Sequence, residues 1–154
     1  MSYKYLFAGV VAGAIIVGLI IFGLMAGASQ SSSQPNHNTV PATKADKIEV
    51  FLFHATQRCT TCIAIGRLAG ETVNEFFQPE IRDGRIEFRE INIDLPENKD
   101  LANKFRASGS ALFINAITNG KDNITEDVNV WRLTQNETQF KKYLKDKIDS
   151  LLGK

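Results

Sequence analysis

The chain has 154 residues, with 18 Lys and Arg against 17 Asp and Glu, and 44% of its residues are hydrophobic. This length fits one domain of ordinary size and leaves room for little else. A formal charge of +1 and an aromatic content of 9% argue against a nucleic-acid-binding protein, which normally carries a basic face, so we expect no nucleic-acid partner.

The N-terminal segment Leu6–Ala28 is apolar and contains no charged residue. A helix of about 23 residues is roughly 34 Å long, which is enough to cross about 30 Å of hydrocarbon. Only Lys4 precedes it and the next charged residue is Lys44, so the positive-inside rule predicts a single-pass anchor in the cell membrane with an extracytoplasmic C-terminal domain. The alternative is a cleaved signal sequence ending at Ala26–Ala28, although the apolar region of a signal is usually about 7–15 residues. We therefore expect residues 1–28 to form a retained transmembrane helix.

Glycine pairs in this segment have the GxxxG spacing that lets two transmembrane helices approach closely. The pairs are Gly9 with Gly13 and Gly23 with Gly27. Because glycine is common in such helices, a homodimer through these pairs is the weaker hypothesis. Residues 29–44 are polar and rich in Ser, Asn and Pro, which predicts a flexible linker. Residues 45–154 are near the usual size of one domain, which we expect to be extracytoplasmic.

The first half of this domain alternates between strand-like and helix-like patterns. The expected elements are a strand at Lys47–His54, a helix from Cys59 to about Phe77, a strand at Arg85–Ile93, a short helix at Asn98–Ala107 and a strand at Ala111–Ile117. In the first helix Gly66 and Gly70 are weak points, and Pro79 and Asp83-Gly84 are expected to stop it. Ser108-Gly109 is expected to end the second helix.

The second half begins with Asn119-Gly120, a strong signal for a two-residue hairpin turn. The returning strand is then expected near Lys121–Thr125, and a helical turn around Trp131. Asn136, with Gln139 three residues on, is a good start for a last helix that ends at Gly153. The resulting order, β-α-β-α-β-β-α, predicts an α/β fold with a mixed four-stranded sheet, a parallel crossover at its start, an antiparallel hairpin at its end and helices on its faces.

The only two cysteines lie in Cys59-Thr60-Thr61-Cys62, where the first strand gives way to the first helix. A helix N-terminus presents unpaired N–H groups and the positive end of the helix dipole, which stabilise a thiolate at Cys59. Arg58 adds a positive charge beside it. Such a thiolate can attack a disulfide in a partner protein, and Cys62 can then resolve the mixed disulfide. A C-x-x-C near a βαβ pattern is a known redox signature, so we predict thiol–disulfide exchange without a cofactor.

Other interpretations of the cysteine pair stay open. A structural disulfide across so short a loop constrains an unfolded chain little. Zinc normally needs two further ligands, and His54 and His37 are the only histidines. Copper(I) accepts thiolates at low coordination numbers, so a metal-handling module using Cys59, Cys62 and His54 is an alternative. His54 lies at the end of an apolar strand, where a packed or hydrogen-bonded role competes. A non-catalytic interaction subunit is a further alternative.

From Lys47 to Leu152 the chain resembles the thioredoxin-like superfamily, through the strand, the C-x-x-C at the helix start and the β-α-β-β-α tail. The resemblance implies that Cys59 is the nucleophile and Cys62 the resolving thiol, with exported protein thiols or disulfides as partners. The tail is also similar to small thioredoxin-like proteins known as a nitroreductase subunit, through Trp131, Phe140 and Tyr143.

The sequence departs from the thioredoxin pattern at three places. Thioredoxins have Trp before the first cysteine and Gly-Pro between the two, where this chain has Arg58 and Thr60-Thr61. The buried acid of the family corresponds to Phe53. The cis-proline that begins the third strand is replaced by Ser110 or Ala111. The resemblance implies that Thr60, Thr61, Ser110 and Ala111 contact the substrate, and the missing proline leaves copper binding open.

Overall fold

The structure is a computed structural model and describes residues 44–154. The predicted anchor Leu6–Ala28, its glycine pairs and nearly all of the predicted linker lie outside the described residues. Within residues 44–154, no helix combines the length and the apolar character needed to cross a membrane.

Four strands form one mixed sheet in the order β2-β1-β3-β4. Their bounds are β1 Lys47–His54, β2 Ile86–Asn92, β3 Ala111–Ile117 and β4 Ile124–Glu126. β1 pairs with β2 in parallel and with β3 antiparallel, and β3 pairs antiparallel with β4. The predicted mixed sheet, with its parallel crossover and its C-terminal hairpin, is therefore confirmed.

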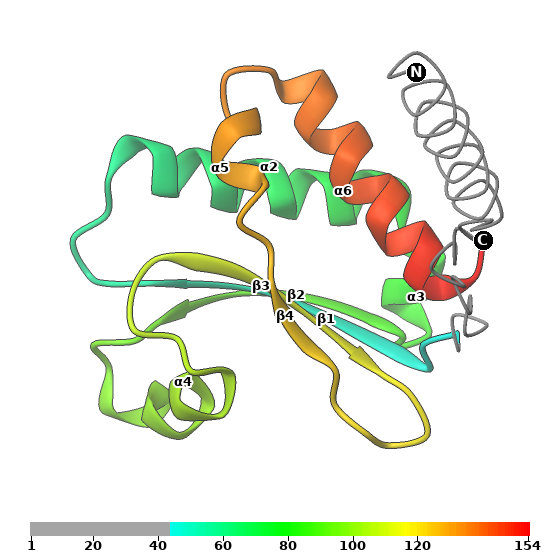
Figure 1. The fold of residues 1–154 in the computed structure, drawn as a ribbon, viewed down its shortest axis with the longest axis horizontal. Coiled ribbons are helices and arrows are strands. Elements are labelled where there is room, and N and C mark those ends of the chain that lie inside the picture. Colours follow the sequence, from blue (N-terminus) through cyan, green and yellow to red (C-terminus); the bar gives the residue numbers. More distant parts are fainter. Residues whose placement is uncertain (1–43) are drawn as a thin grey trace, which may run out of the picture. The chain divides into compact units, whose positions relative to one another are not determined.

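Helices cover both faces of this sheet (Figure 1). They are α2 Thr60–Phe76, α3 Gln78–Arg82, the short 3-10 helix Pro96–Asn98, α4 Lys99–Phe105, α5 Val130–Leu133 and α6 Glu137–Leu152. In Figure 1, α2, α5 and α6 lie on one face and α4 on the other. The central strand β1 serves both cores, because its side chains alternate: Ile48, Val50 and Leu52 join the core under α2 and α6, and Phe51 and Phe53 join an aromatic core under α4.

The first predicted helix ends where expected, whereas the second ends earlier. α2 ends at Phe76, close to the predicted end at about Phe77, and Pro79 lies in the first turn of a separate helix, α3, that the sequence did not predict. Proline suits that position, because the N–H that it lacks would have no intrahelical partner there. The second helix does not reach Ser108-Gly109, because Arg106 caps α4 in the left-handed region, with φ of 55°.

The hairpin turn is confirmed, but the returning strand is shifted. Thr118 and Lys121 exchange two backbone hydrogen bonds of 3.0 Å around Asn119-Gly120, and both turn residues have positive φ. β4 begins at Ile124 rather than near Lys121. The backbone N–H of Asn123 donates to the side-chain oxygen of Asn115, 2.9 Å away, which takes the place of a ladder hydrogen bond.

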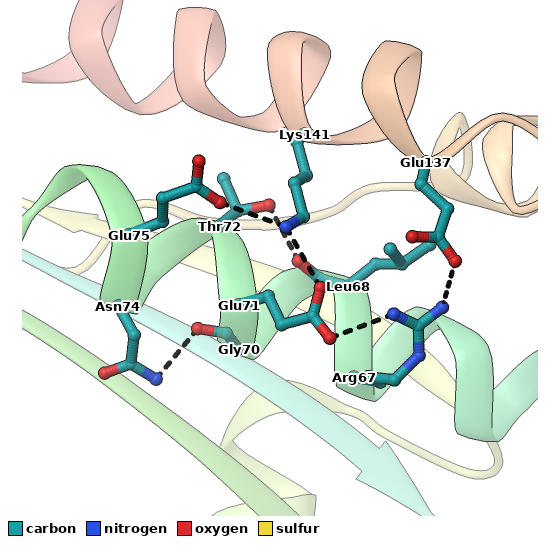
Figure 2. Close-up of polar contacts among 9 residues, drawn as sticks. All are labelled: Arg67, Leu68, Gly70, Glu71, Thr72, Asn74, Glu75, Glu137 and Lys141. Atoms are coloured by element: carbon teal, nitrogen blue, oxygen red, sulfur yellow. Dashed lines mark hydrogen bonds and ion pairs between the residues drawn. The ribbon is translucent and has the colours of Figure 1, made fainter.

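Ion pairs on the surface join α2, the helix that begins at the cysteine pair, to α6 (Figure 2). Arg67 on α2 pairs with Glu71 at 2.9 Å and with Glu137 at the start of α6. Lys141 on α6 lies 3.0 Å from both Glu71 and Glu75. These contacts lower the pKa of Glu71, chiefly through the hydrogen bond from Arg67, and raise the pKa of Lys141, chiefly through its hydrogen bond to Glu75. Because the side chains are partly exposed, we take the network to orient the helices rather than to stabilise them strongly.

Candidate functional site

Cys59 is the N-cap residue of α2, in an extended conformation with φ of −77° and ψ of 158°. Its Sγ accepts a hydrogen bond of 3.1 Å from the backbone N–H of Cys62. A side-chain acceptor at the N-cap commonly binds one of the otherwise unpaired N–H groups of the first turn, and sulfur takes that place here. The structure thus places the leading cysteine at the opening turn of the helix, where the sequence predicts it.

The two cysteines form a disulfide, with Cα atoms 5.1 Å apart. Their exposure differs: Cys59 is solvent-exposed, whereas only 5% of the Cys62 surface is accessible. In disulfide exchange, access decides which sulfur an incoming group reaches. The geometry therefore favours Cys59 as the sulfur that meets a partner and Cys62 as the one that stays inside.

The loop before Cys59, residues 55–58, is held by polar side chains at the end of β2. The carboxylate of Asp94 accepts the backbone N–H of Thr56 at 2.7 Å, and the side-chain amide of Asn92 donates to the Thr56 hydroxyl at 3.0 Å. The hydrogen bond from the Thr56 backbone lowers the pKa of Asp94. Glu90 accepts from Arg58 at 2.6 Å. We call Glu90, Asn92 and Asp94 the β2 clamp, because together they fix the loop that carries Cys59.

Arg58 is paired rather than freely solvated. Its Nη1 lies 2.6 Å from Oε2 of Glu90, and its side chain is 21% exposed. Its Nη2 donates to the carbonyl oxygen of Cys62 at 3.4 Å, and its Nε is buried with no hydrogen-bond partner among the described residues. The positive charge of Arg58 beside Cys59 is therefore accompanied by the negative charge of Glu90.

Gly66 marks the place where this ion pair packs against α2. A Cβ at position 66 would lie 2.5 Å from Oε1 of Glu90, 2.7 Å from Cδ2 of Leu52 and 2.9 Å from Nη2 of Arg58. Residues four apart lie on the same face of a helix, so Gly66 is one turn after Cys62 on that face. Rather than a weak point of the helix, Gly66 is the position that admits the ion pair.

The predicted substrate-contact residues lie in two places. Thr60 is exposed and Thr61 partly buried in the first turn of α2, whereas Ser110 is partly buried just before β3. Ala111 is the first residue of β3 and pairs with Phe53. Phe53 is fully buried in the aromatic core. The role of the four residues in substrate binding stays a prediction.

His54 is placed as a local hydrogen-bonding residue. Its Nδ1 lies 2.9 Å from the carbonyl oxygen of Ala55. Across residues 44–154, no three His, Cys, Asp or Glu side chains gather in a way that could hold a metal ion. The structure therefore does not gather His54 with Cys59 and Cys62, and the copper alternative stays a prediction.

Sequence reasoning did not identify the β2 clamp. A signal is present, because Glu90, Asn92 and Asp94 are polar residues at alternate positions at the end of β2 and just after it, which favours one side of the strand. What the sequence does not show is the register that sets Leu52 opposite Glu90 and so brings this side to the loop before Cys59.

Solved structures similar to this chain include several thioredoxins. The X-ray structure of Fasciola hepatica thioredoxin aligns with a TM-score of 0.41 and 21% identity, covering 66% of this chain and 82% of that one. A solution structure of a thioredoxin from Thermus thermophilus aligns with a TM-score of 0.42 and 14% identity, covering 68% and 76%. Malassezia sympodialis thioredoxin aligns with a TM-score of 0.39 and 21% identity, covering 65% and 80%. No family model and no curated protein matches the chain. The similarity of the tail to a nitroreductase subunit stays a prediction.

Proposed function

We propose that this chain is a membrane-anchored, extracytoplasmic thiol–disulfide oxidoreductase in which Cys59 attacks and Cys62 resolves. The observation that carries the proposal is an exposed cysteine at the N-cap of α2, joined by a disulfide to a buried one. In the reduced pair, the N–H of Cys62 and the helix dipole would stabilise Cys59 as the thiolate, because an anionic acceptor binds these groups more strongly than a neutral one.

The exchange takes two steps. The Cys59 thiolate attacks one sulfur of a partner disulfide, which forms a bond between Cys59 and the partner and releases the other partner sulfur as a thiolate that takes up a proton. Cys62 then loses its proton and attacks Sγ of Cys59, which forms the Cys59–Cys62 disulfide and releases the second partner thiolate. The partner disulfide gains two electrons and the cysteine pair loses two. The reverse sequence would pass the disulfide to a partner dithiol.

The cellular setting of this proposal comes from the N-terminal segment. Leu6–Ala28 contains no charged residue, and Lys4 is the one charged side chain among the residues before it. This pattern supports a single membrane crossing with the domain outside the cytoplasm. The substrates would then be disulfides or dithiols of exported proteins. Disulfides form and persist in such compartments, which agrees with a chain whose two cysteines are paired with each other.

Trapping of mixed disulfides tests the proposal. A full-length Cys62→Ser chain keeps the attacking sulfur but cannot resolve, so it should accumulate reducible adducts with a disulfide-containing test protein. The matched control is Cys59→Ser, which removes the exposed sulfur and should accumulate none. Equal trapping by both variants, or none by Cys62→Ser, would contradict the proposed function.

A further inference from the structure

Among residues 44–154, the charge that pairs with Arg58 is Glu90 on the neighbouring strand. The contact joins Nη1 to Oε2 at 2.6 Å, and the same guanidinium reaches the carbonyl oxygen of Cys62 through Nη2 at 3.4 Å. Cys62 in turn donates its own N–H to Sγ of Cys59. Arg58 and Glu90 are thus linked to the cysteine pair by hydrogen bonds as well as by nearness in the chain.

The ion pair packs over Gly66 of α2. Its two charged groups lie within 3 Å of where a Cβ of residue 66 would stand, at 2.5 Å for Glu90 and 2.9 Å for Arg58. The Arg58 side chain is only 21% exposed, and that of Glu90 35%. Water therefore screens the pair less than it would screen two fully exposed side chains. A change in the charge of Glu90 should consequently change the stability of a thiolate at Cys59.

The sign of this effect follows from Coulomb's law. Arg58 alone would stabilise a thiolate at Cys59, whereas the carboxylate of Glu90 offsets part of that positive charge. A thiolate that is stabilised more strongly makes the reduced pair more stable and the disulfide easier to reduce. Removing the charge of Glu90 should thus favour the reduced pair, and removing the charge of Arg58 should favour the disulfide.

Further ionisable side chains beside this loop include His54, at the end of β1, and Asp94, which holds the Thr56 backbone and whose pKa the charge of Lys99 also lowers. Neither pairs with Arg58, and neither is altered by changing Glu90. Among the described residues, Glu90 is the carboxylate that contacts the arginine.

We propose that Glu90 is a positioning and tuning residue of the cysteine pair: by neutralising Arg58 it limits the stability of the Cys59 thiolate and keeps the pair more reducing than Arg58 alone would make it. This inference deepens the proposed function and rests on it. A residue of β2 thus helps to set the equilibrium between the dithiol and the disulfide forms of the cysteine pair at the start of α2.

The test is a set of full-length variants equilibrated with glutathione redox buffers. Glu90→Gln should shift the equilibrium toward the reduced pair by about threefold or more, which corresponds to roughly half a pKa unit at Cys59. Arg58→Gln should shift it toward the disulfide, and the double variant should lie between the two. Glu90→Asp keeps the charge and should lie nearer the unaltered chain. The matched control is Glu87→Gln, the same change on the same strand, where the carboxylate pairs with Lys47 instead.

Opposite shifts by the two single variants support tuning, because a merely structural role would move both in one direction. Shifts of the same sign, or a Glu90→Gln equilibrium no different from that of Glu87→Gln, would overturn the inference. The pH dependence of Cys59 alkylation gives a second readout, in which Glu90→Gln should react at lower pH. The glutathione equilibrium and the alkylation profile use only small thiols and reagents. They can therefore contradict the role of Glu90 while Cys62→Ser still traps protein partners. Conversely, a loss of trapping would contradict the proposed function but would not change the expected shifts in the glutathione equilibrium.

Discussion

Gly66 lies where the Arg58–Glu90 pair packs against α2, so a single added methyl group there has two opposing effects. Alanine is the better helix former by about 1 kcal/mol. The same methyl group, however, would meet a carboxylate oxygen, a leucine methyl and a guanidinium nitrogen, each closer than 3 Å. Leu52 is fully buried in the core and cannot give way easily. We expect the steric effect to dominate.

Gly66→Ala should accordingly destabilise the domain by about 1–3 kcal/mol, the usual range for overpacking a core. Urea unfolding of the full-length chain measures this. Gly70→Ala is the matched control, because the three atoms nearest to a Cβ there all belong to the ring of Phe88, the first at 2.9 Å, and that ring is partly exposed and has room to shift. A stabilised Gly66→Ala chain would show that the ion pair moves away at little cost.

At the scale of elements, the segment after β4 is tied to α6 by a buried carboxylate. Asp127 is 1% exposed and lies 2.9 Å from both the hydroxyl of Tyr143 and the ammonium group of Lys147. It also accepts the backbone N–H of Asn129 at 3.1 Å. Removing one partner of a buried charge is costly because the other charge is left unpaired in a poorly solvated place.

Lys147→Met keeps the aliphatic length of the side chain and removes its charge, and it should lower the free energy of unfolding by about 3 kcal/mol. Lys142→Met is the control, since Lys142 pairs with Asp146 on the exposed side of α6 and should matter little. Equal effects of the two substitutions in urea unfolding would show that the Asp127 carboxylate is adequately satisfied by its remaining donors.

Elements whose bounds depend only on residues near in the sequence could be predicted well. The short runs rich in β-branched, aromatic and other apolar residues were sufficient to predict the bounds of β1 and β3. Asn136 caps α6 by accepting the backbone N–H of Gln139, 3.0 Å away. The N-cap position of Cys59 belongs to the same class. The β2 clamp does not, because its function depends on strand register, which arises only when the sheet forms. The late start of β4 likewise depends on the tertiary contact between Asn115 and Asn123.

At the scale of the whole domain, acid should weaken the contacts that hold distant elements together. The hydrogen bond from Arg67 lowers the pKa of Glu71 between α2 and α6, and the hydrogen bond from Lys154 lowers that of Glu80 in α3. A carboxyl group whose pKa is lower in the folded chain adds stability at pH values above that of the unfolded group, about 4.3 for Glu, and this stability is lost as the pH falls through the folded value.

The free energy of unfolding should therefore vary little from about pH 7 to about pH 5 and fall below that range. Glu80→Gln should make the acid-induced fall less steep, because the unfolded chain then has one carboxyl group fewer to protonate. Urea titrations at a series of pH values measure both. Stability that rises on acidification would contradict the assignment of these carboxylates as stabilising partners.

The most direct test of the central claim, that Cys59 is the attacking sulfur, is the alkylation rate of each cysteine in the reduced full-length chain, resolved by mass spectrometry. We predict that Cys59 reacts about tenfold or more faster than Cys62 at neutral pH, and that its reactivity persists well below about pH 8.5, the pKa of a free thiol. Equal and slow labelling of the two residues, or faster labelling of Cys62, would contradict this account.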